Sequence, residues 1–351
     1  MNKITVSAPG KLMLLGEHAV VYGHPCIVTA VDQRMRETVE VINEPIFELH
    51  APDVRLTDYR KSITKIGHGE IPKGVKFVEM AVKNSLELNS KFFLRHSGKR
   101  SDSRISYRSN QRDSGQARMT VGIRVTTKSE LSPKLGLGSS AAVVVCTAKA
   151  LSEILGINLS KKELFDVSYK TVLDIQGKGS GFDVAAAVYG GTLYFVTGGK
   201  IIEPLPINSL PLIVGYSGVK ADTVTLINKV KDSFANRQNR LNEIYNRIEV
   251  LVNQAKDALV KMDWESFGSL MNKNQEYLIE LGVSSEKLDN MINAALSAGA
   301  YGAKLSGAGG GDCMIAIVPK DNEQEVKDGI IQAGGKVVNI KTNAEGVRIE
   351  K

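Results

Sequence analysis

The chain has 351 residues, of which 42% are hydrophobic and 24% charged, a composition typical of a globular protein long enough for two domains. Its net charge is +7, but residues 95–118 hold seven Lys or Arg against two Asp, so five of those charges lie in one segment. The nearly balanced remainder argues against nucleic-acid binding, and no run approaches the roughly 18 apolar residues of a membrane helix.

Alternating apolar and polar residues predict four strands near the N-terminus. These are Ile4–Ala8, Lys11–Leu15, Thr38–Ile42 and Ile46–Leu49. Pro9-Gly10 predicts a turn between the first two. Residues 51–74 have mixed composition and predict a loop, whereas the apolar residues of Val75–Leu88 have helical spacing.

Residues 97–117 are mostly Arg, Ser, Asp, Gln and Asn, with Ile105 and Tyr107 as the only sizeable apolar side chains. Such a segment cannot bury a core and predicts a flexible surface excursion. A basic nucleotide-handling or RNA-binding arm is the alternative. Thr120–Thr127 alternates again and predicts a strand.

The stretch P-K-L-G-L-G-S-S-A-A, residues 133–142, leads into an apolar helix that extends to about residue 155. Small hydroxyl residues before such a run predict a helix N-terminus, whose N–H groups suit phosphate. An ordinary glycine loop with an N-cap is the alternative. No P-loop motif occurs, and the G-x-G-x-x-A match at Gly136 lacks the adjoining strands of a nicotinamide-binding fold.

The second half begins with predicted helices at Leu164–Ile175 and Val184–Tyr189 and a strand at Thr192–Val196. A strand at Leu212–Tyr216, three or four long amphipathic helices, a strand at Met314–Val318 and a helix at Asn322–Ala333 follow. Strands followed by helices in each half predict an α+β fold. We expect two domains, residues 1–200 and residues 201–351.

Three glycine-rich clusters are candidates for the functional site. They are P-G-K-L-M-L-L-G-E-H-A-V-V-Y-G-H-P at residues 9–25, the stretch at residues 133–142, and S-G-A-G-G-G-D-C at residues 306–313. Each is weak alone. Together they imply one site built from both domains.

In this combination the chain resembles the GHMP kinases, a superfamily of small-molecule kinases, over nearly its whole length. The first cluster and Ser129-Glu130-Leu131 look like the mevalonate kinase branch, whereas G-K-G-S-G-F-D-V-A-A-A-V-Y-G from Gly177 resembles the phosphomevalonate kinase branch. The resemblance implies the two-domain α+β GHMP kinase fold. Its N-terminal domain would be ribosomal-protein-like, its C-terminal domain ferredoxin-like, and ATP would bind in the cleft between them.

ATP and Mg²⁺ are the cofactors that this resemblance implies. Backbone N–H groups of the phosphate loop would bind the nucleotide phosphates, Ser140 would ligate magnesium, and the third cluster would support the loop. The expected nucleotide-binding residues are Ser129, Lys134, Leu135, Gly136, Leu137, Gly138, Ser139, Ser140, Gly307, Gly309 and Gly310.

The resemblance also places Asp183 as the catalytic base and Lys11 beside it, with Glu17, His18 and Thr223 near the substrate. A carboxylate can accept the proton of an alcohol, and a neighbouring lysine keeps it ionised. Other roles remain open for each residue. Asp183 and Thr223 are alternatively helix N-caps, Lys11 a solvated strand lysine, and His18 a structural histidine.

Some positions depart from the family pattern. Val172 stands where mevalonate kinases carry a magnesium-binding glutamate, and the nearest acid, Asp174, is two residues away. Lys134 replaces a common glycine, and Lys178 would suit a more anionic substrate.

The implied reaction is ATP-dependent phosphorylation of the primary hydroxyl of mevalonate. Phosphomevalonate as acceptor and a non-enzymatic binding protein on the same scaffold are the alternatives. The implied partner is a small-molecule substrate, with no nucleic acid and no membrane, and a homodimer is left open. Three widely spaced cysteines and the lack of a signal-peptide pattern predict a cytoplasmic protein.

Overall fold

The computed structural model describes residues 2–95 and 121–351, so the predicted excursion at residues 97–117 lies outside the described residues. The strands are β1 (Lys3–Leu15), β2 (Pro25–Ile42), β3 (Ile46–Ala51), β4 (Leu56–Ser62), β5 (Gly122–Ser129), β6 (Thr192–Val196), β7 (Ile201–Leu205), β8 (Leu212–Tyr216), β9 (Gly302–Ser306), β10 (Cys313–Ile317), β11 (Lys336–Val338) and β12 (Arg348–Ile349). The helices are α1 (Lys76–Arg95), α2 (Ser139–Ile154), α3 (Lys161–Gln176), α4 (Phe182–Tyr189), α5 (Thr223–Ser233), α6 (Gln238–Val260), α7 (Trp264–Glu280), α8 (Glu286–Ser297) and α9 (Glu323–Gln332).

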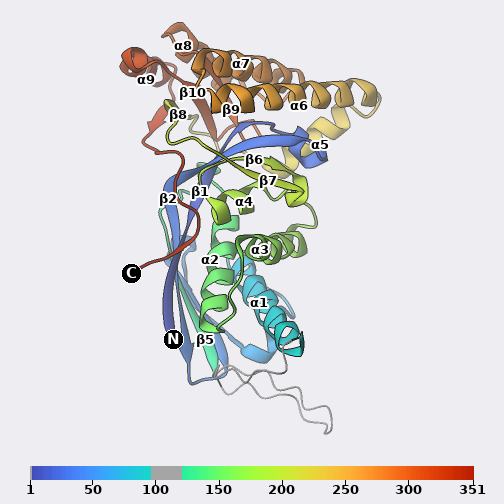
Figure 1. Cartoon of the computed structure of the whole chain (residues 1–351), viewed down its shortest axis with the longest axis vertical. Helices are drawn as coiled ribbons and strands as arrows, with labels where there is room; N and C mark the ends of the chain where they lie inside the picture. The colour runs from blue at the N-terminus through green and yellow to red at the C-terminus, as the bar shows by residue number, and fades with distance from the viewer. Residues whose placement is uncertain (1, 96–120) are drawn as a thin grey trace.

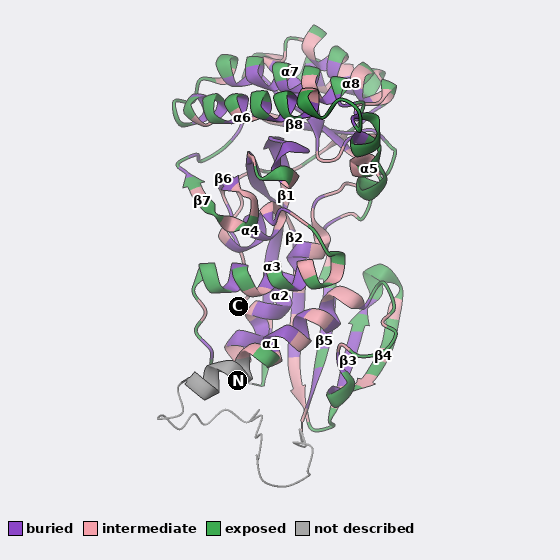
Figure 2. Cartoon of the chain, turned by 90° about the vertical axis from the view of Figure 1, so that its right-hand side faces the viewer, coloured by how far each residue is buried: buried purple, intermediate pink, exposed green. Residues whose placement is uncertain are grey.

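The first sheet has the strand order β12-β1-β2-β5-β3-β4, and β6 and β7 extend it from β2. Its pairings are antiparallel except for the parallel pair β3–β5. Helices α2 and α4 pack on β1 and β2, and α1 and α3 pack on α2. Their buried faces turn toward the sheet in Figure 2. The strands therefore form one wall of a core that α2, the helix after the phosphate loop, completes.

The second sheet, β11-β8-β10-β9, is antiparallel throughout. Helices α7 and α8 pack on β9, and α9 packs on α8. This sheet lies beyond one end of the first sheet along the long axis of the molecule (Figure 1). The α+β fold with two sheets is confirmed. The division at residue 200 stays a prediction, and β7 and β12 add segments from beyond that residue to the first sheet.

Two predictions of local structure are wrong. No turn separates the first two expected strands, because β1 runs unbroken and Pro9-Gly10 forms a bulge where its register with β2 shifts. The expected loop at residues 51–74 contains β4, an edge strand whose alternating exposed and half-buried residues give a weak apolar signal. The other predicted strands and helices are present with shifted ends. No helix within the described ranges is long and apolar enough to cross a bilayer.

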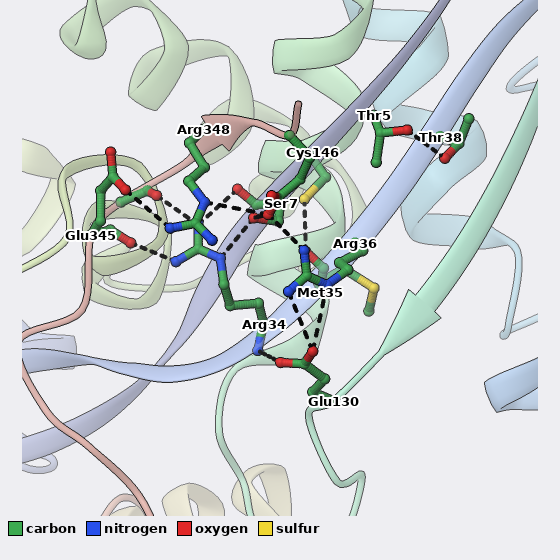
Figure 3. Close-up of polar contacts among 12 residues, drawn as sticks. Thr5, Ser7, Arg34, Met35, Arg36, Thr38, Glu130, Cys146, Glu345 and Arg348 are labelled. Atoms are coloured by element: carbon green, nitrogen blue, oxygen red, sulfur yellow. Dashed lines mark hydrogen bonds and ion pairs between the residues drawn. The ribbon is translucent and has the colours of Figure 1, made fainter.

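Arg34 of β2 binds the C-terminal segment at residues 345 and 346, next to the edge strand β12 (Figure 3). This buried guanidinium donates to the Ser7 hydroxyl over 2.7 Å and to the carbonyl oxygens of Glu345 and Gly346 over 2.8 Å each. The Ser7 carbonyl oxygen, 3.0 Å away, is a fourth acceptor, and these four bonds explain how the protein tolerates an arginine in its interior. These hydrogen bonds hold β12 against β1.

Glu37 on β2 is a second buried ionisable residue, and its side chain faces α2. One of its oxygens lies 3.0 Å from the hydroxyl of Thr147, which also donates to the carbonyl of Val143 over 2.9 Å. The other oxygen has no hydrogen-bond partner among the described residues. Burial raises the pKa of Glu37 to about 8, against a smaller opposing effect of Thr147. A protonated Glu37 satisfies both contacts of Thr147, because one hydroxyl proton cannot serve two acceptors.

The free energy of unfolding should therefore fall between about pH 5 and pH 8, by at most about 1.4 kcal/mol per pH unit. The folded chain retains the proton of Glu37 up to about pH 8, whereas the unfolded chain releases it near the ordinary glutamate value. We expect Glu37→Gln to reduce this slope in urea denaturation at a series of pH values. Glu44→Gln, at an exposed turn position, is the control. Equal slopes for wild type and Glu37→Gln would contradict the assignment.

Candidate active site

Lys11 forms two hydrogen bonds with the phosphate loop. Its backbone N–H donates to the carbonyl of Leu137 over 2.9 Å, and its Nζ donates to the carbonyl of Gly136 over 2.8 Å. A Cβ added to Gly10 would lie 2.8 Å from Leu137 O, so the neighbouring residue must be glycine for the loop to approach. The bulge in β1 thus brings the first glycine cluster against the second.

The phosphate loop ends at Gly138, the N-cap of α2, with a φ of 83°. Ser139 and Ser140 lie in the first turn of the helix, ahead of its apolar run, as expected for a helix N-terminus, although the N-cap is a glycine. Within the described part of the chain, the backbone N–H groups of residues 136–140 are bound to no protein acceptor. Together with the helix dipole, they form an environment that suits an anion such as phosphate.

Asp183 and Lys11 both lie beside Gly138. A Cβ at Gly138 would be 3.2 Å from Lys11 Cγ and 3.7 Å from Asp183 Cβ, so the two side chains meet at this glycine. Asp183 is the second residue of α4, and the N-cap is Gly181. The N-cap interpretation of Asp183 is wrong, although its Oδ1 accepts the N–H of Val184 over 3.0 Å.

The attraction between Lys11 and Asp183 offsets part of the cost of burying each charge. Burial raises the pKa of Asp183, and the charge of Lys11 counteracts part of that rise. Burial also lowers the pKa of Lys11, against the opposing charges of Asp183 and Asp312. The result is a carboxylate with more affinity for a proton than an exposed aspartate, which suits a proton acceptor.

The third cluster approaches the phosphate loop through Asp312, which the sequence analysis did not single out. A Cβ on Gly136 would lie 2.5 Å from Oδ2 of Asp312. The preceding glycines, by contrast, allow close packing inside the second domain. A Cβ on Gly309 would lie 2.1 Å from Val283 O, and one on Gly310 3.0 Å from a methyl of Leu226. Gly307 has a φ of 105° and no neighbour within 4 Å of an added Cβ.

Glu17 and His18 connect the first cluster to the second domain. Glu17 forms a fully buried ion pair with Lys304 of β9, a partner that sequence reasoning missed. Burial raises the pKa of Glu17 and lowers that of Lys304, while the attraction between them opposes both shifts. His18 Nε2 lies 2.8 Å from the carbonyl of Ala308, so this nitrogen carries the proton. Burial lowers the pKa of His18.

The remaining predicted residues lie at the margins. The N–H of Ser129 donates to Asp53 over 2.7 Å, and its hydroxyl contacts the backbone of Leu131. Lys134 is exposed. Thr223 is the exposed first residue of α5, and the N-cap there is Asp222, so the N-cap interpretation of Thr223 is wrong.

Oxygen ligands for a metal are limited in this part of the fold. Val172 is buried in the core, and Asp174 receives hydrogen bonds from Asn84 over 2.9 Å and Lys170 over 2.5 Å. In residues 2–95 and 121–351, no three His, Cys, Asp or Glu side chains gather as a metal site. The Ser140 hydroxyl, in the first turn of α2, is an oxygen ligand that fits a hard cation held jointly with phosphate oxygens.

A helix-initiating glycine loop between two sheets, beside a lysine and a carboxylate, defines a small-molecule phosphotransferase. The family description "GHMP kinases N terminal domain" matches residues 106–191, and "GHMP kinases C terminal" matches residues 255–336. The mevalonate kinase of Pyrococcus furiosus is 34% identical over 360 residues, covering 99% of each chain. The chain belongs to the GHMP kinase family, whose members use ATP.

Solved structures agree with this assignment. Methanococcus jannaschii mevalonate kinase has a TM-score of 0.74 at 26% identity, covering 96% of this chain and 97% of that one. Streptococcus pneumoniae phosphomevalonate kinase, solved with phosphomevalonate and AMPPNP, has a TM-score of 0.75 at 18% identity, covering 97% and 99%. The second likeness shows a shared fold alone.

Gly136→Ala should weaken nucleotide binding, because the new methyl group collides with Asp312 at a φ of 66°. Gly156→Ala is the matched control, since Gly156 has a φ of 69° and open space around it. Both changes should cost roughly 1 kcal/mol of backbone strain. We expect the dissociation constant of ATP, measured by calorimetry, to rise only for Gly136→Ala. Equal binding by the two variants would contradict the placement of Asp312 on the loop.

Proposed function

We propose that this chain transfers the terminal phosphoryl group of ATP to the primary hydroxyl of mevalonate, giving 5-phosphomevalonate. The observation that carries the proposal is the meeting of Lys11 and Asp183 at Gly138, where the phosphate loop becomes α2. A cation, a proton acceptor and an anion cradle are then within one small volume. The relatives named above support mevalonate as the acceptor.

On this proposal, the N–H groups of residues 136–140 bind the phosphate oxygens, and Ser140 ligates Mg²⁺. Magnesium ATP, when bound, supplies the phosphoryl group and neutralises its oxygens. Gly307, Gly309 and Gly310 hold the third cluster where Asp312 reaches the loop, and Ser129 contacts the nucleotide from the end of β5. Positioning and charge neutralisation account for most of the catalysis of such a transfer.

Asp183 accepts the proton of the mevalonate hydroxyl as its oxygen bonds to the γ-phosphorus and the bond from that phosphorus to the ADP oxygen breaks. Lys11 donates to Gly136 O and so remains beside both the loop and the carboxylate. Its positive charge keeps Asp183 ionised before the transfer. The hydroxyl thus loses its proton and gains the phosphoryl group in the same step.

Glu17, His18 and Thr223 contribute to the acceptor side in this proposal. Glu17 and His18 are buried and bind Lys304 and Ala308. They therefore support the residues on the acceptor side. Thr223 offers an exposed hydroxyl at the start of α5. A cytoplasmic location agrees with such a metabolic role.

Phosphomevalonate kinase activity is the second candidate. The exposed Lys178 lies in the loop before α4 and could contact an acceptor that already carries a phosphate. Release of ADP with mevalonate, phosphomevalonate, homoserine and galactose, each at the same concentration, separates the candidates. We expect turnover with mevalonate. Turnover with phosphomevalonate alone would overturn the first proposal in favour of the second, and binding of ATP without any turnover would favour a binding protein.

Asp183→Asn should lower kcat by about 10²- to 10⁴-fold, because the amide cannot accept the hydroxyl proton. The KM for ATP should change little, since the loop N–H groups remain. Asp166→Asn, at an exposed position of α3 that pairs with Lys162, is the control. Steady-state rates from pH 5 to pH 9 measure both. A wild-type rate for Asp183→Asn would exclude Asp183 as the proton acceptor.

A further inference from the structure

Lys220 lies in the connection between β8 and α5, outside the three glycine clusters. Its side chain is 53% exposed, and its Nζ is 3.6 Å from Oδ1 of Asp312. The other oxygen of the same carboxylate lies against Gly136 of the phosphate loop. One carboxylate group therefore separates the ammonium group of Lys220 from the loop.

Asp312 is fixed so that this arrangement has little freedom. Its backbone N–H donates to Val219 O over 2.7 Å, and its carbonyl accepts the N–H of Ser217 over 2.9 Å. Its Oδ1 also accepts the N–H of Ala221 over 3.1 Å. The segment that carries Lys220 is thus bound to Asp312 before and after the lysine, and the second domain places a cation at the edge of the loop.

The pair itself is weak. A half-exposed ion pair contributes little to stability, because water screens the attraction and the long side chain loses freedom. A nucleoside triphosphate carries more negative charge than one carboxylate. Its phosphates would bind the adjacent N–H groups of residues 136–140. Lys220 can then turn toward the phosphates at small cost, since its four-carbon stem is flexible.

The negative charge of Asp312 also requires a counter-charge when phosphates are near. Lys11 is engaged with Gly136 O and lies beside Asp183 at Gly138. Lys220 is bound to Asp312 directly. An ammonium group shared between Asp312 and the phosphates would offset the repulsion between them.

We propose that Lys220 is a phosphate-binding residue of the nucleotide site, and that Asp312 is the positioning residue that holds it at the edge of the phosphate loop. The inference rests on the proposed function, because it assumes that the loop binds nucleotide phosphates. It adds a contact from the second domain to a cradle made by the first.

The test is nucleotide binding by Lys220→Met, measured by calorimetry with ATP in the absence of any acceptor. Loss of one charge-assisted contact should raise the dissociation constant by about tenfold. Lys220→Arg should retain most of the affinity. Lys229→Met is the control, because Lys229 is an exposed lysine of α5 that donates to Gly282 O instead.

Unchanged ATP affinity in Lys220→Met would overturn the inference, and so would an equal loss in Lys229→Met. In steady state, the KM for ATP should rise while the KM for mevalonate stays constant, and a rise in the mevalonate KM alone would place Lys220 on the acceptor side. Thermal melting of each variant checks that folding is intact. If the wild type binds ATP but does not phosphorylate mevalonate, the proposed function fails, while the binding comparison still decides the role of Lys220.

Discussion

The buried ion pair between Glu17 and Lys304 fixes the second domain relative to β1, and the geometry of the site depends on it. Three weaker contacts accompany the pair, from Ser306 to Met13 O, from His18 to Ala308 O and from Gly16 N–H to Asn274. Removing both charges from water costs several kcal/mol per ion, which the attraction repays only in good geometry. One oxygen of Glu17 has no partner in the described residues, so the pair contributes more to the relative position of the domains than to stability.

The relative position of the two domains determines which glycines of the site have no room for a side chain. Gly10, Gly136 and Gly138 are places where an added Cβ would collide with another part of the site. Gly309 and Gly310 would collide with their own domain instead. The third cluster is therefore a packing element that ends in one functional side chain, Asp312. Its distance from the loop is set indirectly, through β9 and Lys304, by the ion pair described above.

Much of the fold could be predicted from the sequence, because apolar periodicity marked most strands and helices. Predictions from apolar periodicity were wrong where other interactions decided the local structure. Pro9-Gly10 has the composition of a turn, yet pairing with β2 on both sides keeps β1 continuous. The clusters that form the site were recognisable from glycine content, and Lys11 and Asp183 from motif likeness. Lys304 and Asp312 were missed because their partners lie 287 and 91 residues away along the chain, although a lysine inside an apolar strand hints at a buried partner.

The electrostatics of the site follow from these positions. Lys11 lies between two carboxylates, Asp183 and Asp312, and burial disfavours its charge while both acids favour it. Burial raises the pKa of Asp183 and the charge of Lys11 opposes that rise, so each residue favours the charged form of the other. Added phosphates would bring further negative charge close to Asp312, and this requires a cation that is not already committed to Asp183. The part of the chain best placed to supply it is the segment bound to Asp312, so nucleotide binding and domain arrangement share one carboxylate.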